Sequence, residues 1–220
     1  MLTATGIQKS YGHLKVLKNI DLEVAKGEIV AIVGASGAGK STLLHILGTL
    51  DNPDSGKVYI HDKDVFAQTS RNLAAFRNRS IGFVFQFHNL LPEFSALENI
   101  MIPGFISGKD SREIRKRAEK LLAMLGISER KDHKPSELSG GEQQRTAVAR
   151  ALINSPDLIL ADEPSGNLDS HNAVELHNLF FKLREELNQT FVIVTHNTDL
   201  SRMADRRVEL RDGMIVKSVL

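Results

Sequence analysis

The sequence contains no cysteine, and none of its apolar runs is long. Without cysteine the chain can form no disulfide and offers no thiolate to a metal. The longest apolar runs, such as Ile29–Val33 and 158–161, are far shorter than the roughly 20 residues that cross a bilayer. The first five residues lack the charged-then-apolar order of a secretory signal, so we expect no such signal. If the protein acts at a membrane, another chain must hold it there.

An excess of charge of one sign is also missing. The 28 Lys and Arg residues face 27 Asp and Glu residues, for a formal net charge of +1. This balance argues against nucleic acid as the main partner, and the basic segment 112–120 is expected to be a solvated helix face. With 220 residues, the chain is long enough for one large domain that carries an inserted subdomain.

Strand and helix patterns alternate along the chain. Apolar and polar residues alternate up to about residue 30, as in Leu14–Val24, which predicts an antiparallel sheet with one solvated face. Short apolar runs, typical of buried parallel strands, follow at Ile29–Val33, 158–161 and Thr190–Val194. We therefore expect one α/β domain over residues 1–220, with a mostly parallel core sheet and an N-terminal antiparallel β subdomain in 1–87 and 156–220. A helical subdomain is expected at 88–155. The predicted helices are 40–50, 111–125, 141–153 and Ser170–Leu187, and further strands are predicted at 57–60, Ile81–Phe85, 207–210 and Met214–Val219.

A glycine-rich segment follows the first buried strand and matches the phosphate-loop pattern G-x-x-x-x-G-K-[ST]. Its residues are Gly34, Ala35, Ser36, Gly37, Ala38, Gly39, Lys40 and Ser41, followed by Thr42. A glycine-rich turn could match by chance, but the strand before it and the helix after it favour a true loop. Its backbone N–H groups would cradle phosphates, Lys40 would reach the β- and γ-phosphates, and Ser41 would ligate Mg²⁺.

Two acids end the buried strand at 158–161. Asp162 and Glu163 come at the carboxyl end of a parallel strand, where open α/β sheets bind ligands. They could merely begin the turn that follows, but beside a phosphate loop a catalytic pair is favoured. Asp162 would hold the Mg²⁺ shell, and Glu163 would polarise a water that attacks the γ-phosphate. His196 and Gln86 end two other core strands, and either alone is weak evidence.

A second glycine-rich stretch, 138–145, predicts another anion site. Ser139 is a good N-cap, and Glu142 three residues later completes a capping-box pattern. Gly140 and Gly141 have no side chains, so their N–H groups can approach a phosphate at the start of a helix. The stretch therefore predicts a second phosphate-reading helix start in a chain that already has a phosphate loop.

Together, these motifs resemble those of ATP-binding-cassette (ABC) ATPases over nearly the whole chain, and the resemblance implies a P-loop NTPase fold. In order they are Tyr11, the phosphate loop, Gln86, 138–145, Asp162 with Glu163, 165–169 and His196. The resemblance implies that Tyr11 stacks on adenine and that Gln86 contacts Mg²⁺ and the attacking water. It implies that Asp169 builds the protomer interface and that His196 contacts the γ-phosphate. Asn197 and Ser165 depart from the usual acid and Thr, without removing a catalytic group.

The resemblance also explains the second anion site. It implies a homodimer on ATP binding, in which one protomer closes over the ATP held by the phosphate loop of the other. The residues that would contact the partner's ATP are Ser139, Gly140, Gly141 and Glu142. The implied cofactors are ATP and Mg²⁺, and the catalytic residues would be Glu163, His196, Gln86 and Lys40.

The stretch 82–100 resembles most closely the ATPase subunits of bacterial lipoprotein-releasing systems. This resemblance implies integral membrane permease subunits that dock near Gln86–Leu97 and a peripheral location on the cytoplasmic face of the inner membrane. The apolar residues of the stretch could instead pack the helical insert onto the core. ATPases of macrolide-type efflux pumps and of the cell-division complex share the catalytic residues and remain alternatives. Non-transport cassettes acting on DNA or ribosomes usually carry coiled-coil insertions or two cassettes, which this chain lacks. A binding module without hydrolysis is disfavoured by Glu163 and His196.

Overall fold

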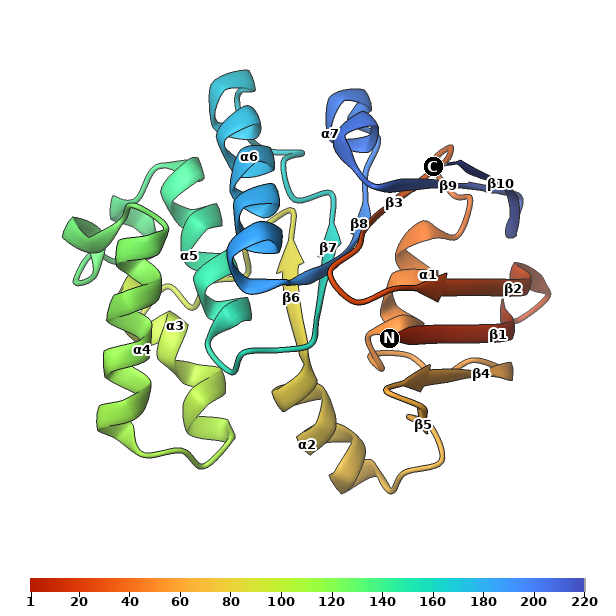
Figure 1. Cartoon of the computed structure of the whole chain (residues 1–220), viewed down its shortest axis with the longest axis horizontal. Helices are drawn as coiled ribbons and strands as arrows, with labels where there is room; N and C mark the ends of the chain where they lie inside the picture. The colour runs from red at the N-terminus through yellow and green to blue at the C-terminus, as the bar shows by residue number, and fades with distance from the viewer. Residues whose placement is uncertain (220) are drawn as a thin grey trace.

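The computed structural model describes residues 1–219, which form two sheets with helices around them (Figure 1). The antiparallel sheet has the order β2-β1-β4-β5, formed by Leu14–Val24, Leu2–Tyr11, Ser55–Ile60 and Lys63–Asp64. The second sheet has the order β10-β9-β3-β8-β7-β6, formed by Met214–Val219, Arg206–Arg211, Ile29–Val33, Thr190–Val194, Leu158–Asp162 and Ile81–Phe85. Within it, β10 is antiparallel to β9 and the other paired strands are parallel. The expected antiparallel N-terminal sheet and mostly parallel core sheet are confirmed.

Apolar side chains cover both faces of the second sheet. Successive side chains of a strand point to opposite faces. Phe191 and Ile193 of β8 therefore join one buried cluster, whereas Val192 and Val194 join another. Helix α1 (Lys40–Leu47) fills the space between the two sheets, and its four buried residues belong to the second cluster. This packing fixes the phosphate loop, which precedes α1, at the carboxyl edge of the core sheet.

Three helices between residues 88 and 155 lie side by side, on the left of Figure 1. They are α3 (Ala96–Ile106), α4 (Ser111–Met124) and α5 (Gly140–Leu152), with short 3-10 turns at Ser128–Arg130 and Pro135–Glu137. Helix α5 packs on β6 and on α6 (Ser170–Leu187), so it joins the helical part to the core sheet. The exact limits of the subdomains stay a prediction.

Several element bounds differ from the expectation. Helix α1 ends at Leu47 rather than at residue 50, because Gly48 caps it and Thr49 adopts a left-handed φ of 60°. Helix α5 begins and ends one residue earlier than predicted. Helices α2 (Ser70–Ser80) and α7 (Thr198–Met203) were not predicted, and α3 lies in the segment 88–155 that was expected to be helical but was not itself delimited. Helix α2 buries none of its residues fully and packs only Leu73 and Phe76 against the second cluster, so its apolar pattern is short and easily overlooked.

Candidate nucleotide-binding and hydrolysis site

The loop between β3 and α1 takes the tight path that its glycines predict. Gly34 has a φ of 155°, and a Cβ there would lie 2.1 Å from the carbonyl oxygen of Leu210. Gly39 has a φ of 100° and caps α1, where a Cβ would lie 2.8 Å from Leu17 Cδ2. Only glycine fits these approaches without a shift of the neighbouring atoms. The first turn of α1 leaves backbone N–H groups without intrahelical partners, and its dipole favours an anion at this point.

A cleft of 610 Å³ lies in front of this loop. The predicted residues that line it are Tyr11, Gly34, Ser36, Gly37, Gly39, Lys40, Ser41, Thr42, Asp162, Glu163 and His196. The predicted residues Ala35 and Ala38 lie outside this lining, and Ala38 is buried. Leu14 and Val16 also line the cleft and were not predicted. The only feature of the sequence that could have pointed to these two residues is their position shortly after Tyr11, in a segment where apolar and polar residues alternate.

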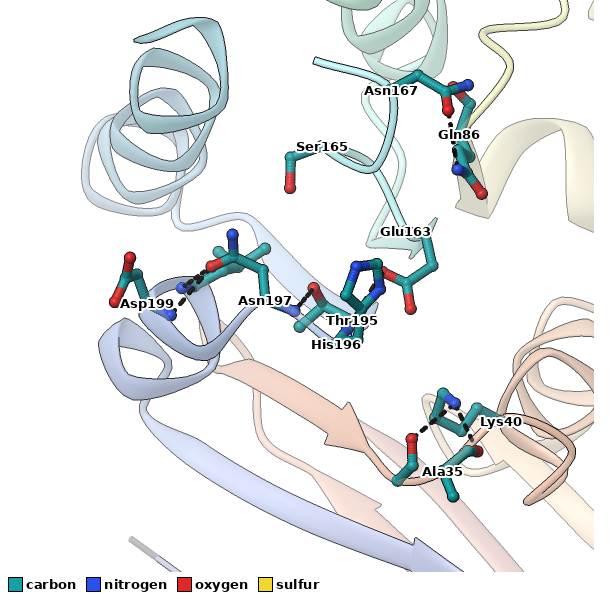
Figure 2. A network of polar contacts seen from close by, with 12 residues as sticks. Ala35, Lys40, Gln86, Glu163, Ser165, Asn167, Thr195, His196, Asn197 and Asp199 are labelled. Carbon is teal, nitrogen blue, oxygen red and sulfur yellow. Dashed lines mark hydrogen bonds and ion pairs between the residues drawn. The ribbon is translucent and has the colours of Figure 1, made fainter. Parts of the chain in front are cut away.

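Lys40 folds back over the phosphate loop. Its Nζ donates hydrogen bonds of 2.9 Å to the carbonyl oxygens of Gly34 and Ala35 (Figure 2). An ammonium group has three donors, so one remains for an anion in the cleft. The two carbonyls thus hold the positive charge at the place where a phosphate would lie against the loop.

Asp162 ends β7 beside the phosphate loop and is partly buried. Burial raises the pKa of its carboxyl group, and the charge of Glu163 adds to the rise. The hydrogen bond with the Ser41 side chain and the charges of His45 and Lys40 lower the pKa, but the net shift is still a rise. A cation placed against this carboxylate would stabilise its charged form and lower its pKa.

Glu163 and His196 meet at the edge of the cleft (Figure 2). The Oε2 atom of Glu163 lies 2.8 Å from Nδ1 of His196 and accepts the His196 backbone N–H at 3.2 Å. Glu163 has a left-handed φ of 46°, and its own N–H donates to the carbonyl of Val194 at 2.9 Å. A non-glycine residue in this region is uncommon and costs backbone energy. The turn therefore directs the carboxylate towards the cleft and away from the strand.

Gln86 is not brought to this cleft. Its Nε2 donates to Oδ1 of Asn167 at 2.9 Å, and its backbone carbonyl oxygen accepts from Nδ2 of Asn167 at 3.1 Å. Figure 2 shows the two side chains beside each other, apart from Lys40. Within residues 1–219 the amide oxygen Oε1 of Gln86 makes no hydrogen bond, and the contact of Gln86 with Mg²⁺ and water stays a prediction.

The predicted capping box at the start of α5 is present. The Ser139 hydroxyl accepts from the N–H of Glu142 at 3.3 Å, and the Glu142 carboxylate accepts from the N–H of Ser139 at 2.8 Å. Within residues 1–219 the N–H groups of Gly140 and Gly141 make no hydrogen bond, and Gly140 is exposed whereas Gly141 is buried. These residues do not line the cleft. The start of α5 is therefore separate from the cleft, and its role as a second anion site stays a prediction.

Residues 17–166 match the family model described as ABC transporter. The chain belongs to the ABC transporter family.

Relatives of this family member are similar over their whole length. A lipoprotein-releasing system ATP-binding protein LolD from Bacteroides thetaiotaomicron is 61% identical over 99% of this chain and 100% of its own. One of the same name from Porphyromonas gingivalis is 57% identical, over 98% of each chain. Among solved structures, a dimeric bacterial ABC transporter cassette, MJ0796, has a TM-score of 0.91 at 40% identity and covers 100% of this chain and 98% of that one. The same cassette is also known as a dimer in a post-hydrolysis state bound to ADP and Pi, with the same score, identity and coverage.

The residues at the two departures from the family pattern both make polar contacts in the fold. Asn197, where an acid is usual, is the N-cap of α7, and its Oδ1 accepts the N–H groups of Asp199 and Leu200 at 3.0 and 2.9 Å. An asparagine caps a helix as well as an aspartate does. Ser165 is buried and its hydroxyl lies 3.1 Å from Nε2 of His177, a buried histidine that the sequence did not single out. This pair ties α6 to the loop after Glu163.

Proposed function

We propose that this chain hydrolyses ATP as one half of a homodimer and thereby drives a membrane transporter. The observation that carries the proposal is the cleft that joins Lys40, Asp162, Glu163 and His196, while the glycine-rich start of α5 lies outside it. Glu163 would act as the general base towards water, and His196 would hold it and contact the γ-phosphate. Tyr11 would stack on the adenine base, with Leu14 and Val16 beside it.

Mg²⁺ would be held by Ser41 and Asp162 together with phosphate oxygens. Among residues 1–219, no cluster of three or more His, Asp or Glu side chains could hold a metal without such help. A hydroxyl, one carboxylate and phosphate oxygens are the ligands that Mg²⁺ prefers. The ion would supply charge neutralisation between the phosphates. Gln86 would join this site through its amide oxygen, because its Nε2 donates to Asn167.

The second protomer would complete each site. Ser139, Gly140, Gly141 and Glu142 would contact the ATP held by the partner's phosphate loop, and Asp169 would lie in the same interface. Support comes from the unpaired N–H group of the exposed Gly140 among residues 1–219, and from the dimeric state of the MJ0796 cassette. ATP then forms part of the interface, so its hydrolysis weakens the dimer and drives a cycle of closing and opening.

A permease subunit would dock on the surface around Gln86–Leu97. Phe87 is 74% exposed, and Leu91, Phe94 and, on α3, Ile106 are also exposed. Beside them, a groove of 490 Å³ is lined by residues that include Phe85, Asn89, Ile106 and Arg150. Exposed apolar side chains gathered at a groove are typical of a protein contact. No helix within residues 1–219 is long and apolar enough to cross a membrane. A docked permease would hold the chain at the cytoplasmic face of the inner membrane.

The cargo would be lipoproteins, released from the inner membrane. This inference follows from the names of the relatives, which are 47–61% identical over almost the whole chain. To test it, the chain would be purified from membranes together with its neighbours. Recovery with a lipoprotein-releasing permease, and ATP hydrolysis that depends on Mg²⁺, would support the proposal. Recovery with an efflux or cell-division permease, or with ribosomes, would refute the assigned transport.

A further inference from the structure

Three side chains outside the phosphate-binding part of the cleft form a closed polar cluster. The Tyr11 hydroxyl donates to Oδ2 of Asp51 at 2.5 Å, and Nζ of Lys9 donates to Oδ1 of the same carboxylate at 2.7 Å. Lys9 also lies over the Tyr11 ring, with its Nζ 5.2 Å from the ring centroid. Lys9 and Tyr11 are two residues apart on β1, so both side chains leave the same face of the strand.

Asp51, the third member of the cluster, is held by a backbone hydrogen bond to α1. Asp51 follows the end of α1, and its N–H donates to the carbonyl of His45 in that helix at 3.3 Å. Lys9 Nζ also donates to the carbonyl of Asn52 at 2.6 Å. The cluster therefore links the end of β1 to the helix that carries the phosphate loop at its other end.

The charges of the cluster stabilise one another. The hydrogen bond with Asp51 raises the pKa of Lys9, although burial opposes the rise. Burial alone would raise the pKa of Asp51, but the hydrogen bonds from Lys9, Tyr11 and the Asn52 backbone outweigh it and lower that pKa. Both groups are thus charged at neutral pH, and Lys9 is only 9% exposed.

The Tyr11 ring is exposed in spite of these ties. Its side chain is 52% exposed and lines the cleft beside Leu14 and Val16. Its hydroxyl is occupied by Asp51, so the part of Tyr11 left for a ligand is the ring face. An aromatic ring held in place before binding loses less freedom when a base stacks on it.

We propose that Asp51, together with Lys9, is a positioning residue for nucleotide binding, which holds the Tyr11 ring as a preformed platform for the adenine base. This inference rests on the proposed stacking of Tyr11. None of the three residues belongs to the phosphate loop 34–41, so loss of the cluster should weaken ligands that carry a base and spare those that do not.

The test compares ATP with inorganic tripolyphosphate, measured by calorimetry on the purified chain. Asp51→Ala is expected to weaken ATP binding about five- to tenfold, the size of a lost stacking contact, and to leave tripolyphosphate binding unchanged. Tyr11→Phe keeps the ring and its packing but removes the bond to Asp51, so it should weaken ATP in the same way. The double variant should be no weaker than either single one, because both remove the same tie.

Asp54→Ala is the matched control. The Asp54 carboxylate also ties its turn to β1, through the N–H of Ser10 at 2.6 Å, but it does not contact Tyr11. It should leave ATP affinity unchanged. Equal weakening by Asp54→Ala, or equal weakening of tripolyphosphate by Asp51→Ala, would overturn the inference. Tyr11→Ala separates the two proposals. If it leaves ATP affinity unchanged, the proposed stacking on Tyr11 is wrong. If Tyr11→Ala lowers ATP affinity and Asp51→Ala does not, only the positioning role of Asp51 is rejected.

Discussion

One oxygen of Glu163 is held twice by His196. Its Oε2 lies 2.8 Å from the imidazole Nδ1 and accepts the backbone N–H of the same residue at 3.2 Å. Among residues 1–219, the other oxygen, Oε1, makes no recorded hydrogen bond. The carboxylate is therefore oriented through one oxygen and keeps the other for a ligand, which is the arrangement that a general base needs.

Glu163→Gln should abolish hydrolysis and retain ATP binding. The amide keeps the shape of the side chain but cannot take a proton from water, and a lost general base lowers the rate by about 10²–10⁴-fold. ATP that is bound and not hydrolysed should then hold two chains together as a stable dimer. Steady-state phosphate release and size-exclusion chromatography with ATP measure the two effects. Hydrolysis at the normal rate in this variant would reject Glu163 as the base.

Gly140→Ala should separate dimerisation from ATP binding by the single chain. A Cβ at Gly140 would lie no closer than 3.6 Å to its own chain, at Leu168 Cδ2, so the free protomer tolerates it. In the proposed dimer the same Cβ would meet the partner's ATP. We expect nearly unchanged ATP affinity for the single chain, with loss of dimer formation and of hydrolysis.

Gly141→Ala provides the contrast, because its Cβ would lie 2.2 Å from Oδ1 of Asn172 within the same chain. This variant should lower the melting temperature, whereas Gly140→Ala should not. If Gly140→Ala instead weakens ATP binding by the single chain, the start of α5 acts within its own protomer.

The parts of the site that were predictable are those encoded locally. The phosphate loop, and the capping box between Ser139 and Glu142, depend on residues a few positions apart, and their patterns are visible in the sequence. The tie between Gln86 and Asn167 joins residues 81 positions apart. It became visible only when the fold placed the end of β6 beside the loop after β7. Sequence reasoning could assign Gln86 to a strand end, but it could not tell which neighbour holds its amide.

Arg150→Lys should loosen the proposed docking surface. Arg150 Nη1 donates to the carbonyl of Asn89 at 2.5 Å and Nη2 to that of His88 at 2.6 Å, and both of these residues have left-handed φ angles, of 50° and 58°. A lysine cannot bond both carbonyls as the planar guanidinium does. Losing one charged hydrogen bond should cost about 2 kcal/mol of unfolding free energy.

The same variant should recover less permease from membranes while its ATP affinity stays unchanged. Arg145→Lys is the control, since Arg145 lies on the same helix but pairs with the exposed Glu175 at 2.9 Å. Equal recovery of permease with Arg150→Lys and with the unaltered chain would mean that Arg150 does not support docking.

Acidification should destabilise the fold partly through His177. Burial lowers the pKa of its imidazole, although the charge of Asp199 opposes the shift. In the unfolded chain this pKa is near 6.5, so between about pH 6.5 and the lower native pKa the unfolded state binds more protons than the native one. The free energy of unfolding therefore rises with pH in this window. The stabilising contribution of His177 is complete above the window and is lost as the pH falls through it.

His177→Gln keeps a polar partner for Ser165 but cannot titrate. Its melting temperature should thus fall less steeply between about pH 7 and pH 5 than that of the unaltered chain. His88 has a pKa lowered first by burial and then by Arg150, so it should leave a residual slope of the same sign in the variant. Parallel slopes in the two proteins would show that His177 does not remain neutral in the fold.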